Sequence, residues 1–115
     1  MKSFVGRIVY QGDIAIERID ALPSNVKKGE RARNEGEIVV GHSETGHHHS
    51  IHDRRVTLLE SSDPLICYLQ VEGKYADLVH HRPVHPHETF RLPTGTYRVR
   101  KQREWTPEGW RRVED

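Results

Sequence analysis

The residues of this chain most capable of chemistry are its histidines, and all of them fall in one part of the sequence. The nine histidines lie between residues 42 and 87, with none in the first 41 residues or the last 28. Imidazole is a good ligand for zinc, iron, nickel, copper and manganese. It is also the side chain most often used for general acid–base catalysis near neutral pH. The clustering therefore indicates a metal site or an acid–base site in the middle of the chain.

The sequence around the first histidine group predicts a β-hairpin, and its two strands would bring histidine side chains close together. The predicted strand, turn and returning strand are residues 37–42, 43–46 and 47–51. Side chains two positions apart on a strand share a face, so we expect His47 and His49 to point one way and His48 the other, toward solvent. Because His42 lies across the turn from His47, we predict that His42, His47 and His49 bind one metal ion. A site with three histidines leaves a coordination position open, which is typical of catalytic metal centres.

A second group farther along the chain repeats the two-residue spacing. His85 and His87 flank Pro86, and we predict that they complete the metal site if their segment folds over the hairpin. The candidate metal is a divalent transition ion, namely zinc, iron, nickel or manganese. Three nearby carboxylates are candidates for orienting a ligand or acting as a general base: Glu44, Asp53 and Glu88. His52 and His81 lie in polar segments and are expected to be solvated.

Short apolar segments separated by glycine and proline turns must position these histidines. Besides the hairpin, the predicted strands are residues 5–10, 13–19, 56–60, 65–71, 75–80, 89–92 and 96–105. Residues 93–95, with the sequence Pro-Thr-Gly, predict a turn between the last two strands. Pro107 suits the start of a helical turn or a tail over residues 107–115. The pattern predicts an all-β fold with little helix, a small barrel or sandwich formed by a single domain over residues 1–115.

The composition limits the classes of protein to consider. The chain has 115 residues, 34% of them hydrophobic and 30% charged, and its formal net charge is +1. It has one cysteine, Cys67, in an apolar segment, so an intramolecular disulfide is excluded and a buried thiol is expected. There is no signal peptide and no apolar run long enough for a membrane span, which leads us to expect a cytoplasmic protein. Phosphate-binding loops, dinucleotide fingerprints and nucleophile elbows are absent from the sequence.

Three segments together resemble a group of small uncharacterised proteins from bacterial and phage genomes. They are Gln11-Gly12-Asp13-Ile14, His42-Ser43-Glu44-Thr45-Gly46-His47-His48-His49 and Leu92-Pro93-Thr94-Gly95-Thr96-Tyr97-Arg98-Val99, the last followed by Gln102, Glu104 and Trp105. The resemblance extends from Tyr10 to Asp115. It implies no activity, because none is established for that group.

A looser resemblance is to the cupins, which are small β-barrels with a metal site. Their first motif is His-x-His followed after three or four residues by Glu, and here residues 47–49 are followed by Asp53 in place of that Glu. The glycine that ends the motif is missing, and residues 93–95 are not followed by the expected histidine. The similarity implies a cupin-like barrel as one form of the all-β fold, and no activity.

The strand near the C-terminus mixes basic and aromatic side chains. We predict that Tyr97 and Val99 face the core and that Arg98 and Arg100 face the opposite side. Basic side chains beside aromatic rings suit single-stranded nucleic acid. Lysine and arginine also protect a solvated edge strand from aggregation, which is the simpler explanation of the same pattern.

Three functions are therefore open. The first is a metal-binding site, with or without enzymatic activity on a small molecule. The second is a module that binds nucleic acid or a protein partner without a metal. The third is a structural or assembly protein of phage or bacterial origin, which would form a homo-oligomer. The sequence patterns favour the first, and they leave the reaction and the substrate open.

Overall fold

The computed structural model describes residues 2–28, 37–41, 49–81, 88–101, 103–106 and 109–112, and these residues form β-structure joined by turns. In chain order the strands are β1 (Lys2–Ser3), β2 (Ile8–Gln11), β3 (Ile14–Ile19), β4 (Lys27–Lys28), β5 (Glu37–Gly41), β6 (His49–His52), β7 (Val56–Glu60), β8 (Ile66–His80), β9 (Glu88–Lys101), β10 (Arg103–Thr106) and β11 (Gly109–Arg112). The predicted all-β class is confirmed. No helix capable of crossing a membrane occurs among the described residues.

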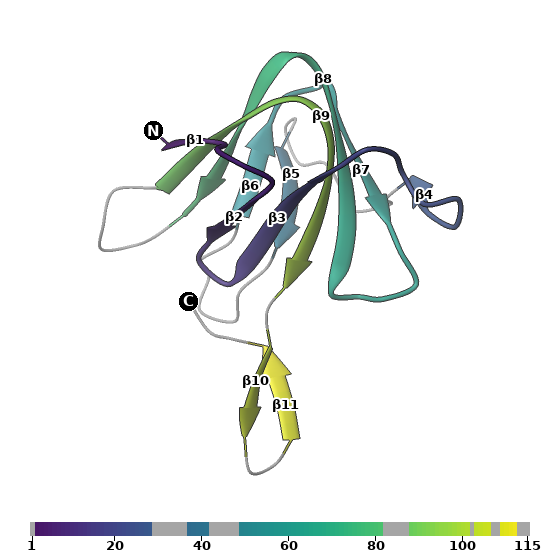
Figure 1. Cartoon of the computed structure of the whole chain (residues 1–115), viewed down its shortest axis with the longest axis vertical. Coiled ribbons are helices and arrows are strands. Elements are labelled where there is room, and N and C mark those ends of the chain that lie inside the picture. The colour runs from purple at the N-terminus through teal and green to yellow at the C-terminus, as the bar shows by residue number, and fades with distance from the viewer. Residues whose placement is uncertain are drawn as a thin grey trace.

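Nine strands form one sheet, which curls into a half-barrel (Figure 1). Its main path runs β2-β3-β9-β8-β6-β5, while β1 pairs with β9 and β7 pairs with both β4 and β8. All of these pairs are antiparallel except β1 with β9. The antiparallel pairing expected of the predicted hairpin is confirmed, since β5 and β6 pair from Glu37 with His52 to Gly41 with His49, whereas its turn at residues 43–46 lies outside the described residues.

The curl depends on two long strands that bend together. The first part of β8 pairs with β7 and the last part of β9, whereas its second part pairs with β6 and the first part of β9. The register shifts between Val71 and Tyr75, where Gly73 has a φ of 80°. A side chain at Gly73 would also meet Arg55, because an added Cβ would lie 2.6 Å from its Nη1. This irregularity lets β8 change its partners without ending.

The predicted turn at residues 93–95 is wrong. The strand β9 runs through these residues, with Pro93 paired to Tyr75 and Gly95 paired to Val71. Proline cannot donate a ladder hydrogen bond, and here it sits beside the register shift of β8, where the ladder is already interrupted. The bend of both strands thus replaces a chain reversal.

The core lies on the concave side of the sheet and follows the expected alternation. Tyr97 and Val99 are buried, as predicted, and so is Cys67. An edge-to-face ring contact and a hydrogen bond hold Tyr97. Its ring meets that of Phe4 with 5.3 Å between centroids, and its hydroxyl donates to the Pro93 carbonyl at 2.5 Å. Burial raises the pKa of this hydroxyl, so it stays protonated and able to donate at neutral pH.

The end of the chain forms a second, two-stranded sheet. In this hairpin β10 pairs with β11, and Trp105 is the partner of Trp110. The predicted helical turn or tail is therefore wrong for residues 109–112. A single helical turn leaves most of its backbone groups unpaired, whereas the hairpin pairs them across two strands.

Removing the centre of the core should destabilise the fold. Leu69 is fully buried and pairs with Tyr97 on one side and Leu58 on the other. We expect Leu69→Ala to lower the free energy of unfolding by about 2–5 kcal/mol, through lost contacts and the cavity left behind. Urea unfolding followed by circular dichroism measures this. Val5→Ala, at a side chain that is 74% exposed, should leave the midpoint nearly unchanged. Equal effects of the two substitutions would contradict this core.

Candidate functional site

Two histidines meet at one end of the half-barrel, where β6 begins and β8 ends. His49 and His80 are paired across these strands. Their rings stack with centroids 4.1 Å apart and an angle of 12° between the planes. Each residue is only 1% exposed. They share the concave face with Ile51 and Leu78, two positions away on each strand, so the column of apolar side chains ends in two imidazoles.

The partners of His49 come from the opposite side of the curled sheet. Its Nδ1 lies 2.8 Å from Gln11 Oε1, and its Nε2 lies 2.9 Å from Asp13 Oδ1. Gln11 is the last residue of β2 and Asp13 lies in the turn before β3, where Gly12 has a φ of 53°. Gln11 is fully buried and Asp13 is 4% exposed. We refer to Gln11, Asp13, His49 and His80 as the histidine–aspartate cluster.

The hydrogen bonds of Gln11 place a proton on Nδ1 of His49. The amide Nε2 of Gln11 donates to the Leu78 carbonyl at 2.9 Å, which turns its oxygen toward His49. That oxygen can only accept, so Nδ1 of His49 must donate to it. The remaining ring nitrogen, Nε2, shares one hydrogen with the carboxyl group of Asp13. The cluster is therefore a buried pair of titratable groups in which both ring nitrogens of His49 have partners.

Sequence reasoning did not identify Gln11 and Asp13 as site residues. The signal in the sequence was indirect: Gln11 falls on the inward face of β2, two positions after Val9, so a polar side chain was bound to enter the core. A buried amide needs a partner, and the partner is 38 residues away in the chain.

Five of the predicted site residues lie outside the described part of the chain. They are His42, Glu44, His47, His85 and His87. The positions where their segments join the sheet are nevertheless known. Gly41 pairs with His49, and Glu88 pairs with His80, so described residues that flank these two segments lie together at the stacked histidines.

Other predicted residues lie elsewhere or have other roles. Asp53 follows the far end of β6, where its carboxylate accepts hydrogen bonds from the Arg55 backbone N at 2.9 Å and from Nε at 3.0 Å. His52 is exposed, as expected. His81 is half-buried rather than simply solvated, because its Nε2 lies 2.8 Å from Ser50 Oγ.

The described side chains do not form a metal site by themselves. Among them, no three histidine, cysteine, aspartate or glutamate side chains form a group that could hold a metal ion. Both nitrogens of His49 are hydrogen-bonded, so it would have to give up one bond to become a ligand. The prediction that His49 is a metal ligand stays a prediction, and its contacts here are those of a residue that positions strands.

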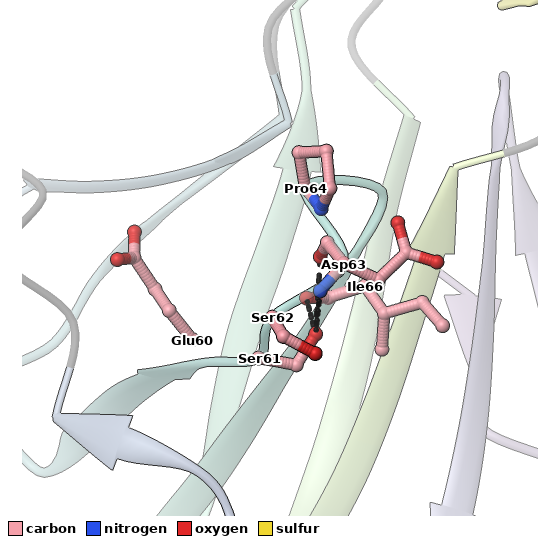
Figure 2. A pocket seen from close by; sticks show the side chains of 6 residues that line it. All are labelled: Glu60, Ser61, Ser62, Asp63, Pro64 and Ile66. Carbon is pink, nitrogen blue, oxygen red and sulfur yellow. Dashed lines mark hydrogen bonds between the residues drawn. The ribbon is translucent and has the colours of Figure 1, made fainter.

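A shallow polar hollow lies at the β7–β8 turn, away from the histidines (Figure 2). Glu60 and Ile66 border it together with the intervening turn. The polar atoms of the turn bond to one another, since Ser61 Oγ accepts from the Asp63 backbone N at 3.1 Å and Asp63 Oδ1 accepts from the Leu65 N at 2.9 Å. These bonds explain the shape of the turn without a ligand.

A family model for a domain of unknown function, DUF8820, matches residues 10–102. The chain belongs to the DUF8820 family. The matched segment contains the whole histidine–aspartate cluster and leaves out β1 and both strands of the C-terminal hairpin. The DUF8820 assignment agrees with the expected resemblance to uncharacterised proteins, and it does not address a bacterial or phage origin or a relation to cupins. No curated protein and no solved structure matches the chain.

Removing the carboxylate of the cluster should destabilise the fold. In Asp13→Ala, Nε2 of His49 loses its hydrogen-bond partner inside the core, and we expect the free energy of unfolding to fall by roughly 1–3 kcal/mol. Chemical denaturation measures this, with Asp20→Ala at an exposed position as the matched control. A side-chain ¹H–¹⁵N spectrum of the wild type should show Nδ1 of His49 protonated. A ring whose Nδ1 carries no proton would contradict the hydrogen-bond assignment.

Proposed function

We propose that the histidine end of this half-barrel binds one divalent transition-metal ion, zinc, iron, nickel or manganese. The observation that carries the proposal is the pairing of His49 with His80, because it brings the bases of both histidine-bearing segments to one place. Residues 42–48 and 82–87 contain five of the nine histidines of the chain. We expect histidines on two segments with neighbouring flanks to reach one ion, and imidazole suits each of the named metals.

The proposal divides the histidines by role. His42, His47, His85 and His87 are the proposed ligands. His49 holds the base of the site through Gln11 and Asp13. A metal site needs a rigid support, because its affinity depends on ligands held near their bound geometry. The histidine–aspartate cluster supplies such a support, since it is buried and joins β2, the turn after β2, β6 and β8.

Stoichiometric metal uptake tests the proposal. The purified, tag-free protein is stripped with a chelator and titrated with each metal chloride by calorimetry, and its metal content is checked by elemental analysis. We expect about one ion per chain and a higher melting temperature with metal, because a ligand that binds only the folded state stabilises it. The double variant His47→Ala/His85→Ala should lose the uptake and keep the circular dichroism spectrum of the wild type.

His52→Ala is the matched control, since it removes a histidine from the end of β6 opposite to His49. It should bind metal as the wild type does. The proposal would be overturned if the wild type took up no metal. It would also be overturned if the wild type and the double variant took up equal amounts. His49→Gln separates support from ligation. It should lower the melting temperature of the metal-free protein, an effect that the ligand variants should not show.

A further inference from the structure

The convex side of the sheet carries a group of arginines beside exposed apolar side chains. Residues paired in register share a face of the sheet. Ile8, Glu17, Arg98 and Tyr68 form one such row across β2, β3, β9 and β8, and Tyr10, Ala15, Arg100 and Ile66 form the next. We call Ile8, Tyr10, Glu17, Arg98 and Arg100 the outer basic face, and Arg7, just before β2, is close enough to act on the charge of Glu17. Its strands lie side by side in Figure 1.

The charge of this face is positive. Glu17 is surrounded by three guanidinium groups, because Arg98 donates a hydrogen bond to it and Arg100 and Arg7 act on it through their charges. The hydrogen bond from Arg98 is the main reason that the pKa of Glu17 lies below its usual value. One carboxylate faces three arginines. Within the described part of the chain, Arg100 forms no ion pair and its side chain is exposed.

The apolar side chains of the face are exposed as well. Tyr10 is 61% exposed and Ile8 is 37% exposed. Both lie on β2, an edge strand of the main sheet path. The arginines beside them, Arg98 and Arg100, lie on β9, which is a central strand and needs no protection against edge-to-edge aggregation. Exposed apolar side chains on an edge strand also work against such protection, so it does not account for the combination.

We propose that the outer basic face binds single-stranded nucleic acid. An exposed ring at Tyr10 offers a surface on which a base can stack, while Arg100 and Arg7 lie where they can attract phosphates. Unpaired bases have accessible faces, whereas those of a duplex are stacked on one another. The arrangement therefore favours single strands over a duplex. This binding is separate from the proposed metal site, which lies at the end of the concave side.

Fluorescence anisotropy with the full chain tests the proposal. The probes are labelled oligouridylate and oligothymidylate of about 12 nucleotides, a length within the range bound by single-strand-binding domains, and a duplex of the same length. We expect both single strands to bind more tightly than the duplex. Stronger binding of the RNA probe would identify contacts to the 2′-hydroxyl, and equal binding would identify the bases and phosphates alone as the ligand.

Variants at exposed positions assign the contacts. Tyr10→Ala should weaken binding by about 5- to 100-fold, and Tyr10→Phe should not, because the ring is kept. Arg100→Ala should reduce the slope of log affinity against log salt concentration by roughly 0.7. Arg54→Ala removes the same charge from the exposed β6–β7 turn and should have little effect. The double variant His47→Ala/His85→Ala should bind as the wild type does, which separates this test from that of the metal site.

Several results would overturn the proposal. One is the absence of oligonucleotide binding, which would leave a protein as the partner of this face. Another is equal weakening by Arg54→Ala and Arg100→Ala, which would show general attraction to polyanions. A third is unchanged binding by Tyr10→Ala together with equal affinity for the duplex.

Discussion

The hydrogen bonds of His49 join parts of the sheet that are not neighbours in its strand order. Gln11 and Asp13 reach His49 from β2 and the turn that follows it, although β9 and β8 separate β3 from β6 in the sheet. The curl of β8 and β9 makes this contact geometrically accessible. The contact in turn closes the interior at one end and gives Gln11, Asp13 and His49 hydrogen-bond partners. An unpaired carboxylate or imidazolium in the same place would destabilise the fold strongly.

The two faces of the sheet have separate roles because strand side chains alternate. On β2, Gln11 points into the cluster and its neighbour Tyr10 points outward; on β9, Tyr97 is buried and Arg98 lies on the outer side. The concave side is filled by the core and ends in the histidine–aspartate cluster. The convex side keeps its charges and an exposed ring. One short run of residues therefore supports both the candidate metal site and the candidate nucleic-acid face.

Much of the fold could be predicted from local patterns, and the exceptions share a cause. Alternation identified the buried positions of β9 and the hairpin of β5 and β6, because it depends only on neighbouring residues. The turn expected at Pro93 did not form, since β8 offers a partner strand through the bend. The strand β11 replaced an expected helical turn because β10 pairs with its backbone. Both outcomes depend on what lies beside a segment in space.

For the candidate site, the sequence by itself determined that histidines gather in the middle of the chain and that a hairpin carries the first group. The predicted strands over residues 5–10 and 13–19 also imply a turn between them. Only the tertiary structure decided that this turn meets His49, 38 and 36 residues away, and that His49 stacks on His80. The reason is physical: the spacing of side chains along a strand is local, whereas contacts across the interior depend on how far the whole sheet curls.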